Sequence, residues 1–130
     1  MDKRIITYEE YGNLLSELVV KIKKSPLINQ INCVFGINRG GHPIAVHLAH
    51  HLNIPYEYLD PEYRLGVSLI VDDIADTGKT LKNYHQDAAA TATLFYKKRS
   101  VVIPTFYVEE TDMWICFPWE RIDEIPNRPE

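Results

Sequence analysis

Three aspartates and a glycine-containing loop form the densest group of residues in the chain that could carry chemistry. Asp72 and Asp73 directly follow the apolar run 67–71, and Asp76-Thr77-Gly78-Lys79-Thr80 comes next. Adjacent carboxylates can accept hydrogen bonds from ribose hydroxyls or bind Mg²⁺ through oxygen. A glycine loop with exposed amides and threonine hydroxyls can bind a phosphate. The pattern indicates a sugar-phosphate site, although paired aspartates also commonly end a strand and solvate a turn.

Alternating helical and strand patterns surround these residues. Thr7 and Glu10 form a capping box, apolar residues then recur at helical spacing, and Pro26 ends the helix. The nearly continuous apolar run 67–71 is typical of a strand buried on both faces. The patterns predict helices over 8–24, 43–52 and about 80–90, and strands over 33–37, 67–71 and 93–96.

This alternation predicts an α/β fold: an open, mostly parallel sheet with helices on both faces. In such sheets ligands bind at the carboxyl ends of the strands, where Asp72 and Asp73 stand. The length of 130 residues fits one domain, 1–130, and the region from about 101 to 124 is a short aromatic C-terminal segment.

Composition limits the partners that we expect. Hydrophobic residues make up 45% of the chain and charged residues 25%, as in ordinary globular proteins. A formal charge of −4 gives no general attraction to nucleic acid. The chain has no apolar signal core or membrane span, and Cys33 and Cys116 lack disulfide or zinc spacing. These features predict a cytoplasmic protein with neither a nucleic-acid nor a membrane partner.

The segment 69–80, Leu-Ile-Val-Asp-Asp-Ile-Ala-Asp-Thr-Gly-Lys-Thr, resembles the phosphoribosyl pyrophosphate signature of type I phosphoribosyltransferases. Three further matches occur in the expected order, so that most of residues 30–120 resemble the xanthine-guanine and hypoxanthine-guanine branch of that family. The resemblance implies a Mg²⁺-dependent enzyme that transfers the phosphoribosyl group from phosphoribosyl pyrophosphate to a 6-oxopurine (guanine, xanthine or hypoxanthine) and releases pyrophosphate. It also implies a homodimer or homotetramer.

The signature assigns the ribose and phosphate contacts by resemblance. Asp72 and Asp73 would hold the ribose hydroxyls and the Mg²⁺ environment. Asp76 would assist proton removal at the purine imidazole ring. The 5′-phosphate would lie in the loop formed by Asp76, Thr77, Gly78, Lys79 and Thr80.

The segment Gly36-Ile37-Asn38-Arg39-Gly40-Gly41 resembles the family's pyrophosphate loop. Asn38, Arg39 and Gly40 would hold pyrophosphate, and Arg39 would act in catalysis by neutralising the leaving group. Family members often carry a cis peptide bond in this loop, which would fall between Asn38 and Arg39. The alternative is an ordinary strand-to-helix turn with no binding role.

The purine contacts follow from the last two matches. Thr93-Leu94-Phe95-Tyr96-Lys97 resembles the strand whose lysine contacts the oxygen at purine position 6, and Trp114-Ile115 resembles the segment that stacks on the base. The aromatic C-terminal segment would therefore cover the base site. Trp119 is expected in the core or at an interface. Because Lys98 and Arg99 follow Lys97, a solvated charged turn is the alternative.

One departure from the family opens a second hypothesis. Only the segment 56–66 separates the second helix from the central strand, where family members carry a longer lid. Tyr58, Tyr63 and Arg64 are the available lid residues. A non-catalytic phosphoribosyl pyrophosphate sensor would also fit a short lid, and a transferase acting on another nucleobase is a further alternative.

Two other patterns lead to weaker hypotheses. Gly78-Lys79-Thr80 is not a Walker A motif, because that motif requires glycine where this chain has Asp73. His47 and His51 share a helix face, but no glutamate or cysteine completes a metal site, so a solvated face is the preferred interpretation.

Overall fold

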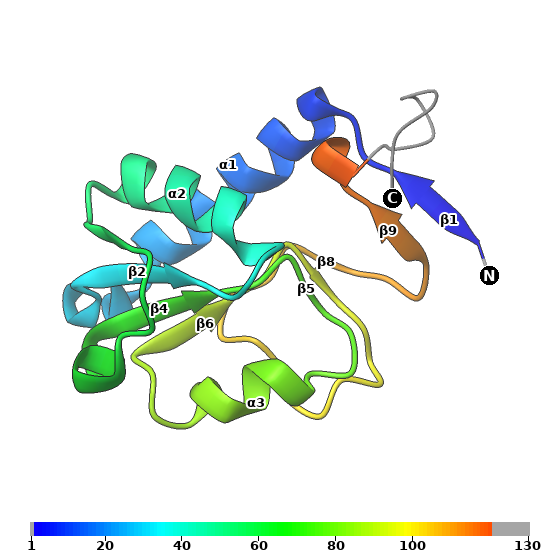
Figure 1. Ribbon diagram of the computed structural model, residues 1–130. Coiled ribbons are helices and arrows are strands. Elements are labelled where there is room, and N and C mark those ends of the chain that lie inside the picture. The colour runs from blue at the N-terminus through cyan, green and yellow to red at the C-terminus, as the bar shows by residue number, and fades with distance from the viewer. Residues whose placement is uncertain (1, 121–130) are drawn as a thin grey trace.

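The computed structural model of the chain describes residues 2–120. Figure 1 shows a central sheet with two long helices on one face and one short helix on the other. The helices are α1 (Tyr8–Lys24), α2 (Gly41–Leu52) and α3 (Lys79–His85), with 3-10 turns at Pro26–Gln30, Glu62–Val67 and Pro118–Glu120. The strands are β1 (Lys3–Ile5), β2 (Cys33–Gly36), β3 (Tyr56–Glu57), β4 (Ser68–Val71), β5 (Ile74–Ala75), β6 (Ala90–Ala92), β7 (Phe95–Tyr96), β8 (Glu109–Glu110) and β9 (Trp114–Cys116).

The central sheet has the strand order β3-β2-β4-β6, and all its pairs are parallel. Strand β4, the predicted central strand, is buried along its whole length. Side chains alternate between its two faces: Leu69 and Val71 belong to the core under α1 and α2, whereas Ile70 packs with Leu81 of α3. The expected α/β class, with helices on both faces of a parallel sheet, is confirmed.

Helix α1 has the predicted bounds. The Thr7 hydroxyl accepts a hydrogen bond from the Glu10 amide at 3.1 Å, and the Glu10 carboxylate accepts from the Thr7 amide at 3.4 Å. These bonds pair amides that would otherwise lack partners at the helix N-terminus. The C-terminal end falls before Pro26, where the chain continues into a 3-10 turn.

The region 80–96 differs from the sequence prediction. Helix α3 ends at His85 rather than near residue 90, and Ala90–Ala92 forms strand β6 beside β4. Phe95–Tyr96 (β7) lies in a second parallel sheet with the order β5-β7-β8. The alanines favour helix by propensity alone. Here they occupy a fully buried position beside the central strand, and that tertiary packing outweighs the local preference.

Sequence patterns did not predict strand β1. It pairs in parallel with β9, so that Lys3 lies opposite Trp114 and Ile5 opposite Cys116. Figure 1 shows this pair at the end of the molecule away from β2 and β4. Within residues 2–120, none of the helices combines the length and apolar character that crossing a bilayer requires. The last part of the predicted aromatic segment, 121–124, lies outside the described residues.

Candidate functional site

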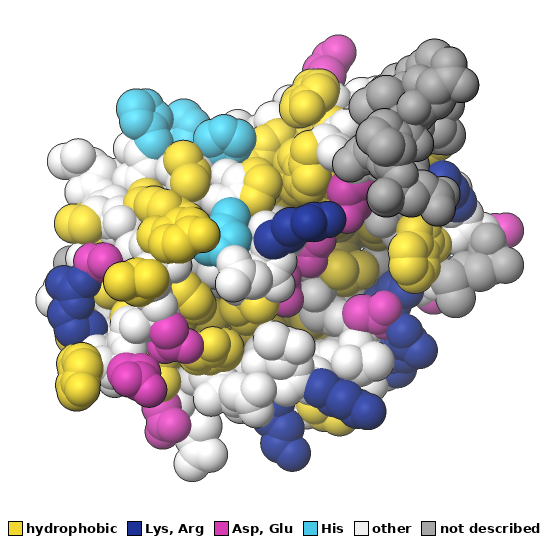
Figure 2. Space-filling view, in the orientation of Figure 1, with side chains coloured by type: hydrophobic (Ala, Val, Ile, Leu, Met, Phe, Trp, Pro, Cys, Tyr) yellow, Lys and Arg dark blue, Asp and Glu magenta, His cyan; other side chains and the backbone are white. Residues whose placement is uncertain are grey.

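The carboxyl ends of β2 and β4 bring the two predicted loops together. Gly36 lies opposite Val71 in the parallel register, and the Ile37 amide donates to the Val71 carbonyl at 2.8 Å. The loop 37–41 and the pair Asp72-Asp73 therefore start from the same edge of the sheet. Figure 2 shows acidic side chains within a hollow on this face and basic side chains around it.

The Asp72-Asp73 pair places two partly buried carboxyl groups next to each other. The Asp72 carboxylate accepts from the Asp73 amide at 2.9 Å, and the Asp73 carboxylate accepts from the Ile74 amide at 2.8 Å. Burial, together with the charge of Asp73, raises the pKa of Asp72 to about 8. Near neutral pH the two side chains therefore carry fewer than two negative charges unless a cation or hydrogen-bond donors join them.

The loop after β5 contains a left-handed glycine directly before α3. Gly78 adopts a left-handed conformation with φ 77°, and the space beside it is filled by the Ser100 hydroxyl. The Val101 amide donates to the Thr77 carbonyl at 2.8 Å, which docks the turn after β7 on this loop. A small cavity of about 160 Å³ is lined by the whole segment from Asp76 to Thr80.

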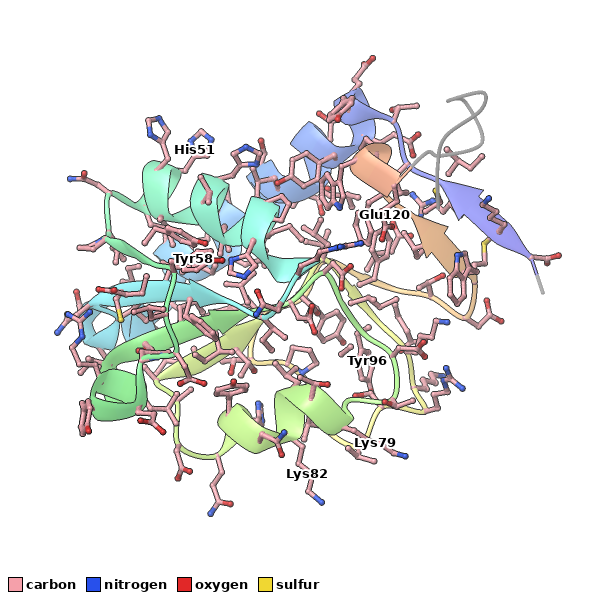
Figure 3. All side chains as sticks on the ribbon, in the orientation of Figure 1. His51, Tyr58, Lys79, Lys82, Tyr96 and Glu120 are labelled. Carbon is pink, nitrogen blue, oxygen red and sulfur yellow. The ribbon has the colours of Figure 1, made fainter. Side chains whose placement is uncertain are left out.

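Several of the predicted contact residues of this loop have exposed side chains. Thr77, Lys79 and Thr80 are exposed. Figure 3 shows the Lys79 side chain pointing away from the sheet into solvent. A contribution of Lys79 to phosphate binding would therefore come from its backbone amide, as in anion-binding turns generally.

The loop after β2 contains the cis peptide bond between Asn38 and Arg39 that the resemblance implied. Gly40 lies against Asp73, since a Cβ atom at Gly40 would overlap Oδ2 and stand 2.8 Å from Cγ of that carboxylate. Asn38, Arg39 and Gly40 line a cavity of about 970 Å³, together with Tyr58 and Trp119. Arg39 is exposed, so its guanidinium can reach a bound anion.

A third cavity, of about 440 Å³, brings together the predicted purine-side residues. Asp73, Asp76, Lys97, Trp114 and Ile115 all line it. It shares Asp76 with the small loop cavity and Glu120 with the larger one, so the three adjoin. The Trp114 side chain is 58% exposed, which leaves an aromatic surface open to a ligand.

Lys97 is not part of a solvated charged turn. Its side chain is only 7% exposed, and its Nζ lies 3.6 Å from Asp76 Oδ1. Arg99 Nε donates to the same oxygen at 2.7 Å. Lys98, by contrast, is 81% exposed and pairs with Glu110 at 3.7 Å. The three consecutive basic residues therefore have different environments, and two of them meet at Asp76.

Two charged residues that were not predicted also line the purine-side cavity. Lys3 reaches it because β1 pairs with β9, and Glu120 reaches it from the 3-10 turn Pro118–Glu120. No local sequence pattern marks Lys3, because its place in the cavity depends on a partner strand more than a hundred residues away. The Glu120 carboxylate also caps its own turn by accepting from the Phe117 amide at 3.0 Å.

The remaining candidates divide between packing and the site. Trp119 stacks on Phe117 with ring centroids 5.1 Å apart and meets Tyr11 edge-on, so it is a packing residue that also borders the larger cavity.

Of the lid candidates, Tyr58 lines the larger cavity, whereas Arg64 pairs with Glu57. Tyr63 is 99% exposed. On α2, the Nδ1 atom of His47 lies 2.6 Å from the Tyr11 hydroxyl.

Comparison with solved structures identifies similar molecules. The chain matches the purine phosphoribosyltransferase of Pyrococcus horikoshii Ot3 with a TM-score of 0.74 and 28% identity, covering 100% of this chain and 99% of the other. It matches the xanthine-guanine-hypoxanthine phosphoribosyltransferase of Helicobacter pylori with a TM-score of 0.75 and 20% identity, covering 94% and 95%. A hypothetical protein from Neisseria gonorrhoeae with bound ppGpp matches with a TM-score of 0.73 and 24% identity, covering 95% and 93%.

No family model matches the sequence, and no curated protein matches it. The match to the Pyrococcus enzyme nevertheless extends over both chains almost completely. The fold is therefore that of the type I phosphoribosyltransferases, and the three adjoining cavities lie at the carboxyl ends of its strands. Within that class of enzyme, the chain is similar to the branch that includes purine, xanthine-guanine and hypoxanthine-guanine phosphoribosyltransferases.

Proposed function

We propose that this enzyme transfers the 5-phosphoribosyl group from phosphoribosyl pyrophosphate to a 6-oxopurine, in purine salvage. The observation that carries the proposal is the shared cavity of Asp76, Lys97 and Trp114 beside the Asp72-Asp73 pair. A purine needs a stacking surface, a donor for its 6-oxygen and an acceptor near its imidazole ring, and these three side chains supply them. A protein that only sensed phosphoribosyl pyrophosphate would not need the purine side.

In the proposed reaction, N9 of the purine attacks the anomeric carbon of the ribose. The carbon–oxygen bond to pyrophosphate breaks with its electron pair leaving on oxygen, and the ring passes through a state with oxocarbenium character. Asp76 accepts the proton that the purine imidazole ring loses. Arg39 and the loop from Asn38 to Gly40 neutralise the charge that develops on pyrophosphate, and positioning supplies much of the rate enhancement.

The ribose and its phosphate bind on the other side of Asp76 in this proposal. The ribose hydroxyls donate to Asp72 and Asp73. The 5′-phosphate accepts from the amides of the segment 77–80 and from the hydroxyls of Thr77 and Thr80. This arrangement is supported by the cavities, because the loop cavity and the purine-side cavity share Ile74 and Asp76.

The Asp72-Asp73 pair fits a requirement for Mg²⁺. Burial and mutual repulsion raise the pKa of Asp72, so a divalent cation close to the pair would be bound with favourable charge compensation. Among residues 2–120 no cluster of three or more His, Cys, Asp or Glu side chains could hold a metal by itself. Oxygens of the substrate and water would complete the coordination, and the ion would supply charge neutralisation for the diphosphate.

The geometry supports 6-oxopurines over adenine. Lys97 is a donor at any pH where it is charged, so it matches an oxygen acceptor and not the amino group at position 6 of adenine. Because Lys97 is nearly buried, the mismatch would leave a buried ammonium without a base partner. Discrimination among guanine, xanthine and hypoxanthine depends on purine position 2, which these side chains do not contact in the proposed pose.

The direct test measures pyrophosphate release and nucleotide formation with phosphoribosyl pyrophosphate, Mg²⁺ and each of guanine, xanthine, hypoxanthine, adenine and uracil. We expect turnover with 6-oxopurines and a loss of about a hundredfold or more in Asp76→Asn, in line with the usual contribution of a general base. Turnover restricted to adenine or uracil would keep the enzyme class and reject the roles given to Lys97 and Trp114. Binding of phosphoribosyl pyrophosphate without any turnover would favour a sensor.

The assembly and its location complete the proposal. We propose a homodimer or homotetramer in the cytoplasm. The exposed apolar side chains Val20 of α1 and Val46 of α2 are available for such a contact, since large exposed apolar residues are common at interfaces. Sedimentation equilibrium of the wild-type protein and of Val20→Asp would test it, with a shift toward monomer expected in the variant.

A further inference from the structure

His42 occupies a position that the proposed reaction does not use. It is the second residue of α2, directly after the loop 37–41, and it lines the cavity that Arg39 and Gly40 also border. Its ring lies among aromatic side chains: it stacks on Tyr58 with centroids 5.5 Å apart and 26° between planes, and it meets Phe35 and Tyr56 edge-on. Such packing limits the orientations open to the ring.

Both ring nitrogens of His42 have hydrogen-bond partners. Nδ1 lies 2.6 Å from the hydroxyl of Tyr56 in β3, and Nε2 bonds to the side-chain Oδ1 of Asn38. Since an amide oxygen can only accept, Nε2 must carry the proton. In the neutral ring Nδ1 is then an acceptor, and the Tyr56 hydroxyl donates to it. A directed chain therefore runs from Tyr56 through His42 to Asn38.

This chain connects a strand of the sheet to the loop that would receive pyrophosphate. Tyr56 is held by the pairing of β3 with β2, whereas Asn38 stands in the exposed loop directly before Arg39. Figure 3 shows Tyr58 on one side of the start of α2 and Glu120 on the other. Asn38 thus receives a fixed hydrogen bond from a ring that is itself fixed by the aromatic side chains and by Tyr56.

We propose that His42 is a positioning residue that holds Asn38, and with it the Arg39-Gly40 segment, in the geometry that binds the diphosphate end of the substrate. The proposal rests on the proposed function for the identity of that ligand. Ordering a loop residue at the moment of binding costs backbone conformational entropy. A loop that is already held binds its ligand without that cost, which is the usual advantage of preorganisation.

Three substitutions separate the hydrogen bonds from the packing. His42→Phe keeps an aromatic ring against Tyr58 but removes both bonds. His42→Gln restores an amide donor that can reach Asn38. Tyr56→Phe keeps its own ring and removes only the first bond of the chain. His50→Phe is the matched control, because His50 is exposed on the same helix.

The steady-state readout is the KM for phosphoribosyl pyrophosphate, measured separately from the KM for the purine. We expect His42→Phe to raise the former about tenfold and the latter less than twofold, with a melting temperature close to that of the wild type. Tyr56→Phe should give a smaller rise, and the double variant should be no worse than His42→Phe because both changes break one chain. His42→Gln should recover most of the loss, and His50→Phe should match the wild type.

A second readout does not depend on turnover. Calorimetry with inorganic pyrophosphate and Mg²⁺ should show weaker binding to His42→Phe by a similar factor, and wild-type binding by His42→Gln within about threefold. If the wild type makes no nucleotide but this pattern appears, the proposed function fails and the positioning role stands. If His42→Phe binds pyrophosphate and phosphoribosyl pyrophosphate as well as the wild type does, the positioning role is wrong. A loss in His42→Phe that Tyr56→Phe does not share, and that His42→Gln does not recover, would contradict the hydrogen-bond chain as its cause.

Discussion

Gly40 of the loop after β2 lies directly against the carboxylate of Asp73, so the loop 37–41 and the Asp72-Asp73 pair share one surface. A Cβ atom added to Gly40 would overlap Asp73 Oδ2 and stand 2.8 Å from its Cγ. Asp73 cannot easily move away, because its carboxylate accepts from the Ile74 amide and its carbonyl accepts from the amides of Leu94 and Phe95. The absence of a side chain at Gly40 is therefore what allows the two halves of the site to meet.

Gly40→Ala should impair the enzyme without unfolding it. We expect kcat/KM for phosphoribosyl pyrophosphate to fall about a hundredfold, because the loop or Asp73 must shift by an appreciable fraction of an ångström. Gly12→Ala is the control, since nothing lies within 4 Å of a Cβ there and Gly12 stands in α1. That change should leave activity unaltered and stabilise the protein by about 0.5 to 1 kcal/mol. Equal activities of Gly40→Ala and the wild type would contradict the close approach.

Asp72 should make stability depend on pH. Its pKa is raised from 3.8 to about 8 by burial and by the charge of Asp73. Between those values the folded protein binds more protons than the unfolded chain, so the free energy of unfolding falls as pH rises from about 4 to 8. Asp72→Asn removes this term and should raise the melting temperature by about 5 °C more at pH 8 than at pH 5.

The same variant reports on the cation. Added Mg²⁺ should raise the melting temperature of the wild type at pH 8, because it binds the folded carboxylate pair, and should raise that of Asp72→Asn less. Asp112→Asn, a change at an exposed aspartate, is the control. If all three proteins respond alike to pH and Mg²⁺, the assignment of Asp72 to the metal environment is wrong.

Arg99 and Lys98 form a natural pair for testing the network at Asp76. Arg99 Nε donates to Asp76 Oδ1 at 2.7 Å, whereas Lys98 pairs with the exposed Glu110. Because the Arg99 side chain is 60% exposed, its bond to Asp76 is screened by solvent and should contribute little to stability. Arg99→Gln should lower kcat about fivefold through the orientation of Asp76, and Lys98→Gln should not change it. Indistinguishable kcat values in the two variants would show that Arg99 does not orient Asp76.

The sequence was sufficient to predict elements whose signals are local. The bounds of α1 follow from its capping box and its proline, and β4 follows from a continuous apolar run. Asp72 and Asp73 were expected at the carboxyl end of their strand, where ligands bind in such sheets, and the structure places them there beside the loop 37–41. The grouping of Lys97 with Asp76 and Trp114 came from the family resemblance rather than from spacing, and the structure places all three around one cavity.

The elements and site residues that could not be predicted depend on contacts between segments that are far apart in the sequence. Ala90–Ala92 looks helical in isolation and becomes a strand only because it pairs with β4. Lys3 has no local signal for the site and reaches it only through the pairing of β1 with β9. His42 lies directly before the predicted helix 43–52 and carries no local signal, and its partners Tyr56 and Asn38 become visible only when β3 and the loop are placed in space.

Trp114 and Trp119 should separate base binding from stability. Trp114 is 58% exposed and lines the purine-side cavity, whereas Trp119 stacks on Phe117 and meets Tyr11 edge-on. Trp114→Leu should raise the KM for the purine about tenfold, because base–aromatic stacking contributes about 1 to 3 kcal/mol, and should leave the melting temperature nearly unchanged.

Trp119→Leu should show the opposite pattern. Loss of its packing should lower the melting temperature by several degrees and change the purine KM by less than threefold. Both quantities come from the same preparations, by steady-state kinetics at varied purine concentration and by thermal unfolding followed by circular dichroism. If Trp119→Leu instead raises the purine KM and Trp114→Leu only destabilises the fold, the roles of the two tryptophans must be exchanged, and the base would lie nearer to the loop 37–41 than to Lys97.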